Sequence, residues 1–270
     1  MDGLCASDVL FIKNFWLKII RLFYKLIYLT LVGMYTHIDI RNFYAACEQY
    51  LNPEYKGKPI AVYNESSFGN RKIIAVSKEV KERYGLSRDS SVNHAERFGV
   101  KLIESRLKEY GGIALKLFNI CVEHVGNKHS VTHPHIDDIV MEVPDLKTAM
   151  GLSREVEKEY NKLGFDIAIG ISFNKDYADL ATKMGKKYGL TYFGKGFAMR
   201  FFHEHPVIEF PNIGPKRQEQ LNKIGIFTIG DIADSHLNII EAALGKNIGR
   251  KIYFSVKSID LNDAQLEMLF

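Results

Sequence analysis

The hydrophobic positions change period along the chain, alternating between the spacing of strands and that of helices. Residues 34–40, 56–65 and 165–173 have the β-branched, alternating character of strands. Apolar residues at helical spacing occur in segments 42–51, 113–125, 146–164 and 175–189, and residues 71–85 pass from a strand into a basic helix. Beyond about residue 190 the chain has short helical stretches separated by Gly and Pro. The pattern predicts an α+β or α/β fold with one central sheet and a separate small helical unit.

The stretch "HPHIDDIVMEV" (133–143) places two adjacent carboxylates in a run that otherwise predicts a buried strand over 135–143. Asp137 and Asp138 repel each other, and burial without a partner costs free energy. In an ideal strand the two side chains point to opposite faces. We expect a bend near Pro134 to bring both carboxylates to one site.

A third carboxylate, Asp39, ends the first predicted strand, at the position where open sheets expose functional groups. If strands 35–40 and 135–143 are neighbours, Asp39 converges with Asp137 and Asp138, and divalent cations offset the repulsion. Oxygen-only ligation favours Mg²⁺, and two such ions would clamp the reacting oxygens of a phosphoryl transfer.

The histidines beside the acidic pair suggest an alternative. His133 and His135 would share one face of an extended segment with Asp137, and His129 lies just upstream. An H-x-H pair with carboxylates is typical of zinc or iron hydrolases. Polar histidines before a strand are also common in ordinary loops, so both interpretations remain open.

Composition restricts the class of protein without identifying it. The chain has 270 residues with a net charge of +4, and its pI is about 8.7, which permits a nucleic-acid partner. Its three cysteines, Cys5, Cys47 and Cys121, are far apart and lack metal-ligand spacing, which favours a reduced, cytoplasmic protein.

Residues 1–33 form an apolar and basic extension. Lys13, Lys18, Arg21 and Lys25 interrupt it, so no uncharged run of roughly 18–20 residues exists and we expect no membrane span. An amphipathic surface helix is one interpretation. The other is a start assigned too early, with Met34 as the true first residue.

Basic helices supply candidate groups for a phosphate-bearing ligand. Lys78 and Lys81 share one helix face, and Lys183, Lys186 and Lys187 gather at the end of another helix. Near a carboxylate–metal site such cations would hold a triphosphate, although a solvated helix face is the simpler interpretation.

The segment "FPNIGPKRQEQLNKIGIFTIGDIA" (210–233) resembles a helix–hairpin–helix module. A tight turn that opens a helix exposes backbone N–H groups, which bind a DNA phosphate without reading sequence. The candidate contacts are Asn212, Ile213, Gly214, Lys216 and Arg217. A plain pair of antiparallel helices is the alternative.

In this order, the motifs resemble those of the Y-family translesion DNA polymerases, particularly the UmuC-like branch, from Met34 to about residue 260. "HIDIRNFYAACEQ" resembles the first motif, "VSKEVKERYGL" the helix that touches the incoming triphosphate, "HIDDIVMEV" the S-x-D-E motif, and "GISFNKDYADLATKMGKKYG" the segment G-I-[SA]-x-N-K…A-K-x-A…K-P-x-G. The resemblance implies a palm of residues 34–41 and 113–186, fingers of 42–112, a helical thumb of 187–260 with the helix–hairpin–helix, and a tail of 261–270.

The same resemblance implies roles for individual residues. Two Mg²⁺ ions would be held by Asp39, Asp137, Asp138 and the Ile40 carbonyl, with the three aspartates catalytic. Tyr44 matches the aromatic gate against a ribose 2′-hydroxyl; the other expected nucleotide contacts are Phe43, Lys78, Lys81 and Lys186. Primer–template DNA and deoxynucleoside triphosphates are the implied partners, with a sliding clamp or other replication and SOS proteins.

The sequence departs from the family pattern at several positions. Asp138 stands where the motif has Glu, His135 where it has Ser, and Asp179 where it has a Lys expected to face the triphosphate. Lys78 stands where many members have Tyr, and we expect no C-terminal little finger domain. The predicted activity is therefore a weak DNA polymerase. The alternative is an inactive paralogue that binds DNA or a polymerase partner.

Overall fold

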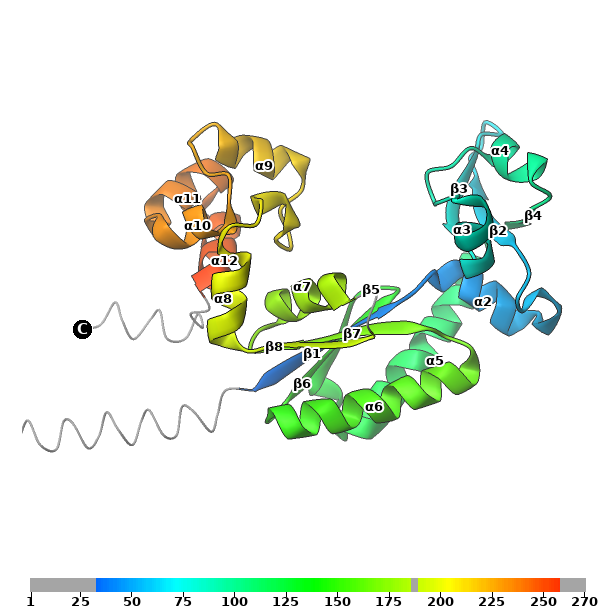
Figure 1. Cartoon of the computed structure of the whole chain (residues 1–270), viewed down its shortest axis with the longest axis horizontal. Coiled ribbons are helices and arrows are strands. Elements are labelled where there is room, and N and C mark those ends of the chain that lie inside the picture. The colour runs from blue at the N-terminus through cyan, green and yellow to red at the C-terminus, as the bar shows by residue number, and fades with distance from the viewer. Residues whose placement is uncertain (1–32, 186–188, 258–270) are drawn as a thin grey trace, which may run out of the picture.

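The computed structural model describes residues 33–185 and 189–257, which form three units (Figure 1). A large sheet unit forms the base, a small sheet unit rises from one end of it, and a helical unit rises from the other. The predicted extension of residues 1–33, except Gly33, lies outside the described residues, as do Lys186, Lys187 and the predicted tail.

The large sheet has five strands in the order β5-β6-β1-β7-β8. Their bounds are β1 Met34–Ile40, β5 Val131–His135, β6 Asp138–Val143, β7 Ile167–Ser172 and β8 Leu190–Phe193. The central strand β1 runs antiparallel to both β6 and β7, and β8 runs parallel to β7. Helices α5 (Leu107–Val125) and α6 (Leu146–Leu163) cover one face, and α7 (Lys175–Gly185) covers part of the other (Figure 1).

The two faces of β7 differ in side-chain size. Ile167, Ile169 and Ile171 are buried in the main core, while Ala168, Gly170 and Ser172 alternate with them on the other face. A Cβ atom at Gly170 would overlap the Ala178 carbonyl and the Thr182 amide of α7. The small residues on this face therefore let α7 lie directly against the sheet.

The small sheet unit has strands β2 (Ile60–Glu65), β3 (Arg71–Val76) and β4 (Lys101–Glu104), in the order β3-β2-β4, with helices α3 (Lys78–Tyr84) and α4 (Val92–Arg97). Helix α2 (Phe43–Leu51) and the short η1 (Pro53–Tyr55) connect β1 to it. The fully buried carboxylate of Glu48 in α2 accepts hydrogen bonds from Arg106 (2.9 and 2.6 Å) and from the Tyr110 hydroxyl (2.7 Å). These bonds satisfy the buried charge and fasten α2 to the start of α5.

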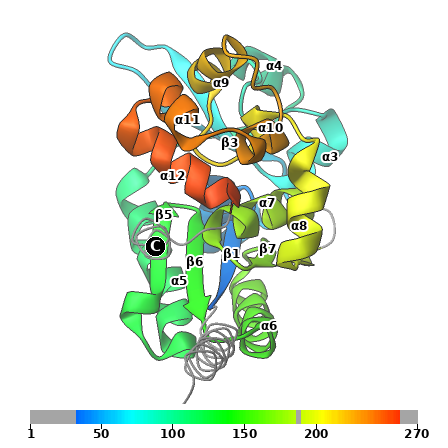
Figure 2. The ribbon, with the colours of Figure 1, turned by 90° about the vertical axis from the view of Figure 1, so that its left-hand side faces the viewer.

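The helical unit has its own hydrophobic core. It contains α8 (Lys195–His203), η3 (Val207–Glu209), α9 (Pro215–Asn222), α10 (Ile229–Asp234), α11 (Leu237–Leu244) and α12 (Lys246–Lys257). Figure 2 shows α12 above α7, which lies on the strands, and α8 beside α7. The Tyr177 hydroxyl of α7 donates to the Val256 carbonyl of α12 (3.1 Å), and the Asn174 amide donates to the Ser255 carbonyl (3.2 Å). Helix α7 therefore contacts both the sheet and the helical unit.

The structure corrects the prediction of one strand over residues 135–143. Ile136 and Asp137 form a two-residue turn, so His135 ends β5 and Asp138 begins β6. The apolar run continues through the turn because the Ile136 side chain packs against the main core, which concealed the turn in the sequence. Asp137 therefore lies in a turn and not in the strand, so it need not point to the face opposite Asp138. A bend at Pro134 is not what brings the two carboxylates together.

Other element boundaries differ from those expected. The predicted boundary between residues 112 and 113 falls inside α5, and residues 190–193, which we assigned to the helical unit, form β8 in the large sheet. The short strand β4 lies in a mixed polar stretch that gave no strand signal. The predicted strand at 34–40 has the expected bounds, and the strand at 165–173 and the helices at 42–51, 146–164 and 175–189 are present within four residues of theirs.

We predict that Gly170→Ala lowers the free energy of unfolding by about 1–3 kcal/mol, because the added methyl group forces α7 away from the sheet. Urea denaturation would measure the change. The control is Gly151→Ala, in the interior of α6, where an added Cβ atom meets nothing within 4 Å. This substitution should raise the free energy of unfolding by about 0.5–1 kcal/mol, because alanine favours the helix. Equal stability of the natural chain and Gly170→Ala would show that α7 does not rest on this glycine.

Candidate functional site

Three carboxylates meet at one end of β1 and β6. Asp39 and Asp138 are direct partners in the antiparallel pair, so their side chains lie on the same face, with Cβ atoms about 4.5–5.5 Å apart. Asp137 is in the adjoining turn, and its carbonyl accepts a hydrogen bond from the Ile40 amide (2.9 Å). The structure thus brings together the three acidic residues that the sequence selected.

The electrostatic state of Asp137 reflects this crowding. Burial, and then the negative charges of Asp138 and Asp39, raise the pKa of the Asp137 carboxyl above its usual value. A nearby positive charge would relieve both effects.

The donor set fits a divalent cation that prefers oxygen ligands, since it offers three carboxylates and no thiolate. Within residues 33–185 and 189–257, however, no three acidic, histidine or cysteine side chains already surround one common metal position. Binding of a cation would therefore require the carboxylates to reorient. The Ile40 side chain is buried in the core, and the ligand role expected of its carbonyl stays a prediction.

Imidazole groups contact Asp138 from two sides, which the sequence analysis did not anticipate. His135 Nδ1 lies 3.0 Å from Asp138 Oδ2, and His37 Nε2 lies 3.9 Å from Asp138 Oδ1. His37 also lies 4.0 Å from Asp179 Oδ1, and Asp179 pairs with Lys183 at 2.8 Å. His37 was detectable, because it precedes Asp39 by two residues and so shares its face.

The structure does not support the metallohydrolase alternative. Although His133 and His135 are two residues apart, the pairing of β5 with β6 shifts register between Thr132 and His135. The His133 ring packs against Phe118 of α5, with ring centroids 5.2 Å apart, whereas His135 contacts Asp138. The two imidazoles therefore have different neighbours and do not form one ligand pair.

The two aromatic residues expected to contact a nucleotide have different environments. Tyr44 is partly buried, and burial followed by the charge of Asp137 raises the pKa of its phenol, while Arg88 lowers it. Tyr44 thus lies near the carboxylates, with the Arg88 cation, which we had not selected, close by. Phe43 is only 2% exposed and packs in the main core, and the nucleotide contact expected of it stays a prediction.

The candidate cations lie on exposed parts of the chain. Lys78 and Lys81 are exposed on α3, and Lys78 is 3.8 Å from Glu82 of the same helix. A bond of 3.4 Å from Gln49 to Glu79 connects α3 to α2. No contact of either lysine with the carboxylates is present, so their role stays a prediction.

The predicted phosphate-binding turn of the helical unit precedes α9. Asn212 has a left-handed backbone (φ 66°), and its carbonyl accepts a hydrogen bond from the Arg217 guanidinium. Ile213 is buried in the core of this unit, while Gly214 and Lys216 are exposed. Lys216 is thus available to a ligand, and Arg217 also stabilises the turn.

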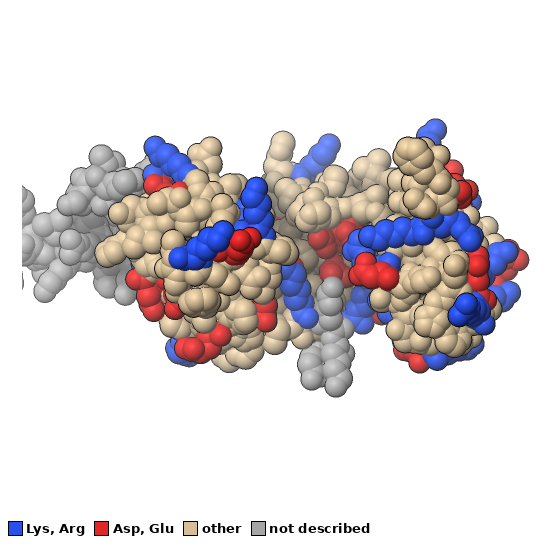
Figure 3. Space-filling view, turned by 90° about the horizontal axis from the view of Figure 1, so that it is seen from above, with Lys and Arg blue, Asp and Glu red and all other residues tan. Residues whose placement is uncertain are grey.

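Viewed from above, acidic side chains lie in the hollow between the helical unit and the small sheet unit, with Lys and Arg on both sides (Figure 3). The carboxylate end of β1 and β6 belongs to the part of the sheet between these units. The basic side chains on both sides of the hollow favour a phosphate-bearing ligand, whereas the acidic side chains within it repel one. Such a ligand therefore fits only when cations neutralise the acidic side chains.

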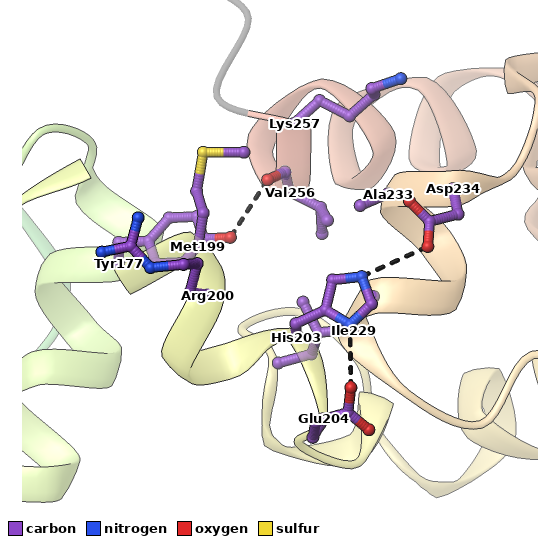
Figure 4. A pocket seen from close by; sticks show the side chains of 11 residues that line it. Tyr177, Met199, Arg200, His203, Glu204, Ile229, Ala233, Asp234, Val256 and Lys257 are labelled. Atoms are coloured by element: carbon purple, nitrogen blue, oxygen red, sulfur yellow. Dashed lines mark hydrogen bonds and ion pairs between the residues drawn. The ribbon is translucent and has the colours of Figure 1, made fainter. Parts of the chain in front are cut away.

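A cavity of about 480 Å³ lies elsewhere, between α7, α8, α10 and α12 (Figure 4). In it His203 lies between Glu204 and Asp234, at 3.2 Å from each, and these carboxylates raise the pKa of its imidazole. Gly230 leaves room for this ring. The cavity contains none of the residues that we expected to be catalytic.

None of the helices in the described part of the chain has the length and apolar character needed to cross a membrane.

We predict that Asp137→Asn raises the free energy of unfolding by about 0.5–1 kcal/mol at pH 7 in metal-free buffer, because it removes a repelled, partly buried charge. Folding raises the pKa of the Asp137 carboxyl, so its charge destabilises the folded state at pH values above the folded-state pKa. This destabilisation disappears as the pH falls below the pKa of an unfolded aspartate. The gain should therefore shrink as pH approaches 4.

Chemical denaturation with a chelator present would measure this effect. Asp166→Asn is the matched control, since Asp166 is exposed and pairs with Arg41 at 3.2 Å, and its loss should change stability little. A lower stability of Asp137→Asn at pH 7 would contradict the assigned crowding.

Known proteins of similar sequence are DNA polymerases by name. The chain is 29% identical over 229 residues to DNA polymerase IV 2 of Mesorhizobium japonicum, covering 80% of this chain and 51% of the relative. It is 30% identical over 220 residues to DNA polymerase IV of Bacillus velezensis, covering 78% and 51%. The chain thus spans about half the length of these curated relatives.

Solved structures share the fold. A post-insertion binary complex of Dbh DNA polymerase matches with a TM-score of 0.72 and 22% identity, covering 84% of this chain and 67% of the other. DinB from Sulfolobus solfataricus matches with a TM-score of 0.67 and 21% identity, over 83% and 67%. The mixed α+β architecture is that of Y-family polymerases, as the sequence predicted. The family model described as "impB/mucB/samB family" matches residues 38–183, just over half of the chain, and the protein belongs to this family.

Proposed function

We propose that this chain is the catalytic core of a template-directed DNA polymerase of the lesion-bypass type. The observation that carries the proposal is the pairing of Asp39 with Asp138 across β1 and β6, with Asp137 in the adjoining turn. The large sheet unit corresponds to a palm, the small sheet unit to fingers and the helical unit to a thumb. Primer–template DNA would lie in the hollow between the last two (Figure 3).

The carboxylates would hold two Mg²⁺ ions, together with the Ile40 carbonyl. When bound, the ions neutralise phosphate charge and lower the pKa of the primer 3′-hydroxyl. The chain's own contribution is placement: the β1–β6 register fixes Asp39 opposite Asp138, and the turn holds Asp137 beside them. Attack on the α-phosphate then forms the new ester bond and releases pyrophosphate.

The remaining proposed roles concern binding. Tyr44 would exclude a ribose 2′-hydroxyl, a role supported by the influence of the Asp137 charge on the pKa of its phenol. Lys78, Lys81 and Lys186, the last of which lies outside the described residues, would steady the triphosphate. The turn at Asn212, Ile213 and Gly214, with Lys216 and Arg217, would bind a DNA phosphate as a helix–hairpin–helix. We place the protein in the cytoplasm, with a sliding clamp or other SOS proteins as partners.

We predict that the natural chain extends a primer with Mg²⁺ and that Asp39→Asn reduces single-turnover extension at least about 100-fold, because one negative charge that would hold the cations at the reacting centre is lost. Asp166→Asn, an exposed carboxylate near the same end of the sheet, is the control and should retain extension. Comparable losses in both variants would refute the assigned site. Primer–template binding by the natural chain without extension in Mg²⁺ or Mn²⁺ would favour the inactive, DNA-binding alternative.

The same assay tests Tyr44. With Tyr44→Ala, incorporation of ribonucleotides should rise relative to deoxyribonucleotides, because a smaller side chain leaves room for the 2′-hydroxyl. Unchanged sugar discrimination would remove Tyr44 from the gate.

A further inference from the structure

Asp138 is held from both sides by imidazole groups. Its Oδ2 atom lies 3.0 Å from His135 Nδ1, within hydrogen-bond distance, and its Oδ1 atom lies 3.9 Å from His37 Nε2. The Asp138 side chain is 22% exposed, so solvent reaches it only in part. The direction of this carboxylate is therefore set mainly by its protein neighbours.

The contact between His135 and Asp138 is fixed by the backbone. The two residues are direct partners where β5 and β6 meet, separated by the two-residue turn. Partners in an antiparallel pair have Cβ atoms about 4.5–5.5 Å apart on the same face. His135 is 74% exposed, so its ring has no core to fill and Asp138 is its hydrogen-bonding partner.

The second imidazole is oriented by α7. His37 Nδ1 lies 3.0 Å from the Thr182 hydroxyl, whose single proton has the Ala178 carbonyl (2.9 Å) and the His37 carbonyl (3.2 Å) as acceptors. The Thr182 hydroxyl is thus hydrogen-bonded to the His37 ring at Nδ1 as well as to backbone carbonyls. The bond at Nδ1 directs His37 Nε2 toward Asp138 and Asp179.

Positions 135 and 138, both of which depart from the family pattern, are thus in direct contact. An aspartate extends one methylene less than a glutamate, so its oxygens reach roughly 1.5 Å less far. A longer side chain at 138 would meet the His135 ring, and a serine at 135 would leave Asp138 Oδ2 without this donor. The two residues are complementary in size and in hydrogen bonding.

We propose that His135 is a positioning residue that fixes the direction of the short Asp138 carboxylate at the cation site shared with Asp39 and Asp137, and that residues 135 and 138 act as one unit. The proposal rests on the proposed function, because it assigns Asp138 to a cation site. On this proposal, the histidine at 135 compensates for the shorter acidic side chain at 138, so the two departures from the family pattern belong together.

A double-mutant cycle measured by Mn²⁺ binding tests this, with free Mn²⁺ followed by electron paramagnetic resonance. His135→Ser and Asp138→Glu should each weaken Mn²⁺ binding about tenfold, the scale of losing a group that orients a ligand. The double variant should bind within about threefold of the natural chain, because the pair couples. His135→Asn, whose amide donates from nearly the same place as Nδ1, should preserve binding.

His133→Ser is the matched control, since His133 is a nearby exposed histidine of β5 that contacts Phe118 instead. It should leave Mn²⁺ affinity unchanged, and thermal unfolding with a chelator should show that every variant folds. Natural affinity in His135→Ser, or a double variant as weak as the product of the single effects, would overturn the proposal, as would absence of Mn²⁺ binding by the natural chain. Coupled Mn²⁺ binding without primer extension would retain the positioning role and reject the polymerase function.

Discussion

The antiparallel register between β1 and β6 is the constraint on which the site depends. It places Asp39 opposite Asp138 on one face, while Ile38 and Ile139, also partners, are buried on the other. A slip of one residue would expose these isoleucines and bury the carboxylates. Burial of the apolar face thus keeps the acidic residues together despite their mutual repulsion, which adds to the effect of burial in raising the pKa of Asp137.

The packing of α7 determines the surroundings of that site. Because Gly170 lets α7 lie directly on β7, Thr182 reaches His37, and Asp179 lies 4.0 Å from His37 Nε2, the nitrogen that also faces Asp138. Asp179 is paired with Lys183, so its charge is partly compensated within the chain. The expectation that Asp179 faces a triphosphate is untested, although its observed neighbours are protein groups close to Asp138.

The sequence predicted the parts of the fold in which local pattern and burial agree. The isoleucine alternation of β7 and the helical spacing of α6 are strong signals because each element packs one face against the core. The turn at Ile136 and Asp137 escaped detection because Ile136 continues the apolar run, and β8 because four residues carry little periodicity. Both features depend on pairing with distant strands.

The candidate site shows the same division. Asp39, Asp137 and Asp138 were found because carboxylates at strand ends contradict a buried pattern. The contact of His135 with Asp138 depends on the strand register, and the orientation of His37 depends on how α7 packs on the sheet. Residue types alone reveal neither. Phe43 was assigned to a nucleotide from its motif, although its ring is a core residue.

We propose that the β1–β6 register builds a cation site from carboxylates. Crystals of the chain grown with Mn²⁺ and a deoxynucleoside triphosphate would test it directly through the anomalous scattering of manganese. We expect anomalous peaks about 2 Å from carboxylate oxygens of Asp39 and Asp138. Manganese bound only at other side chains, with Asp39 and Asp138 both unligated, would contradict it.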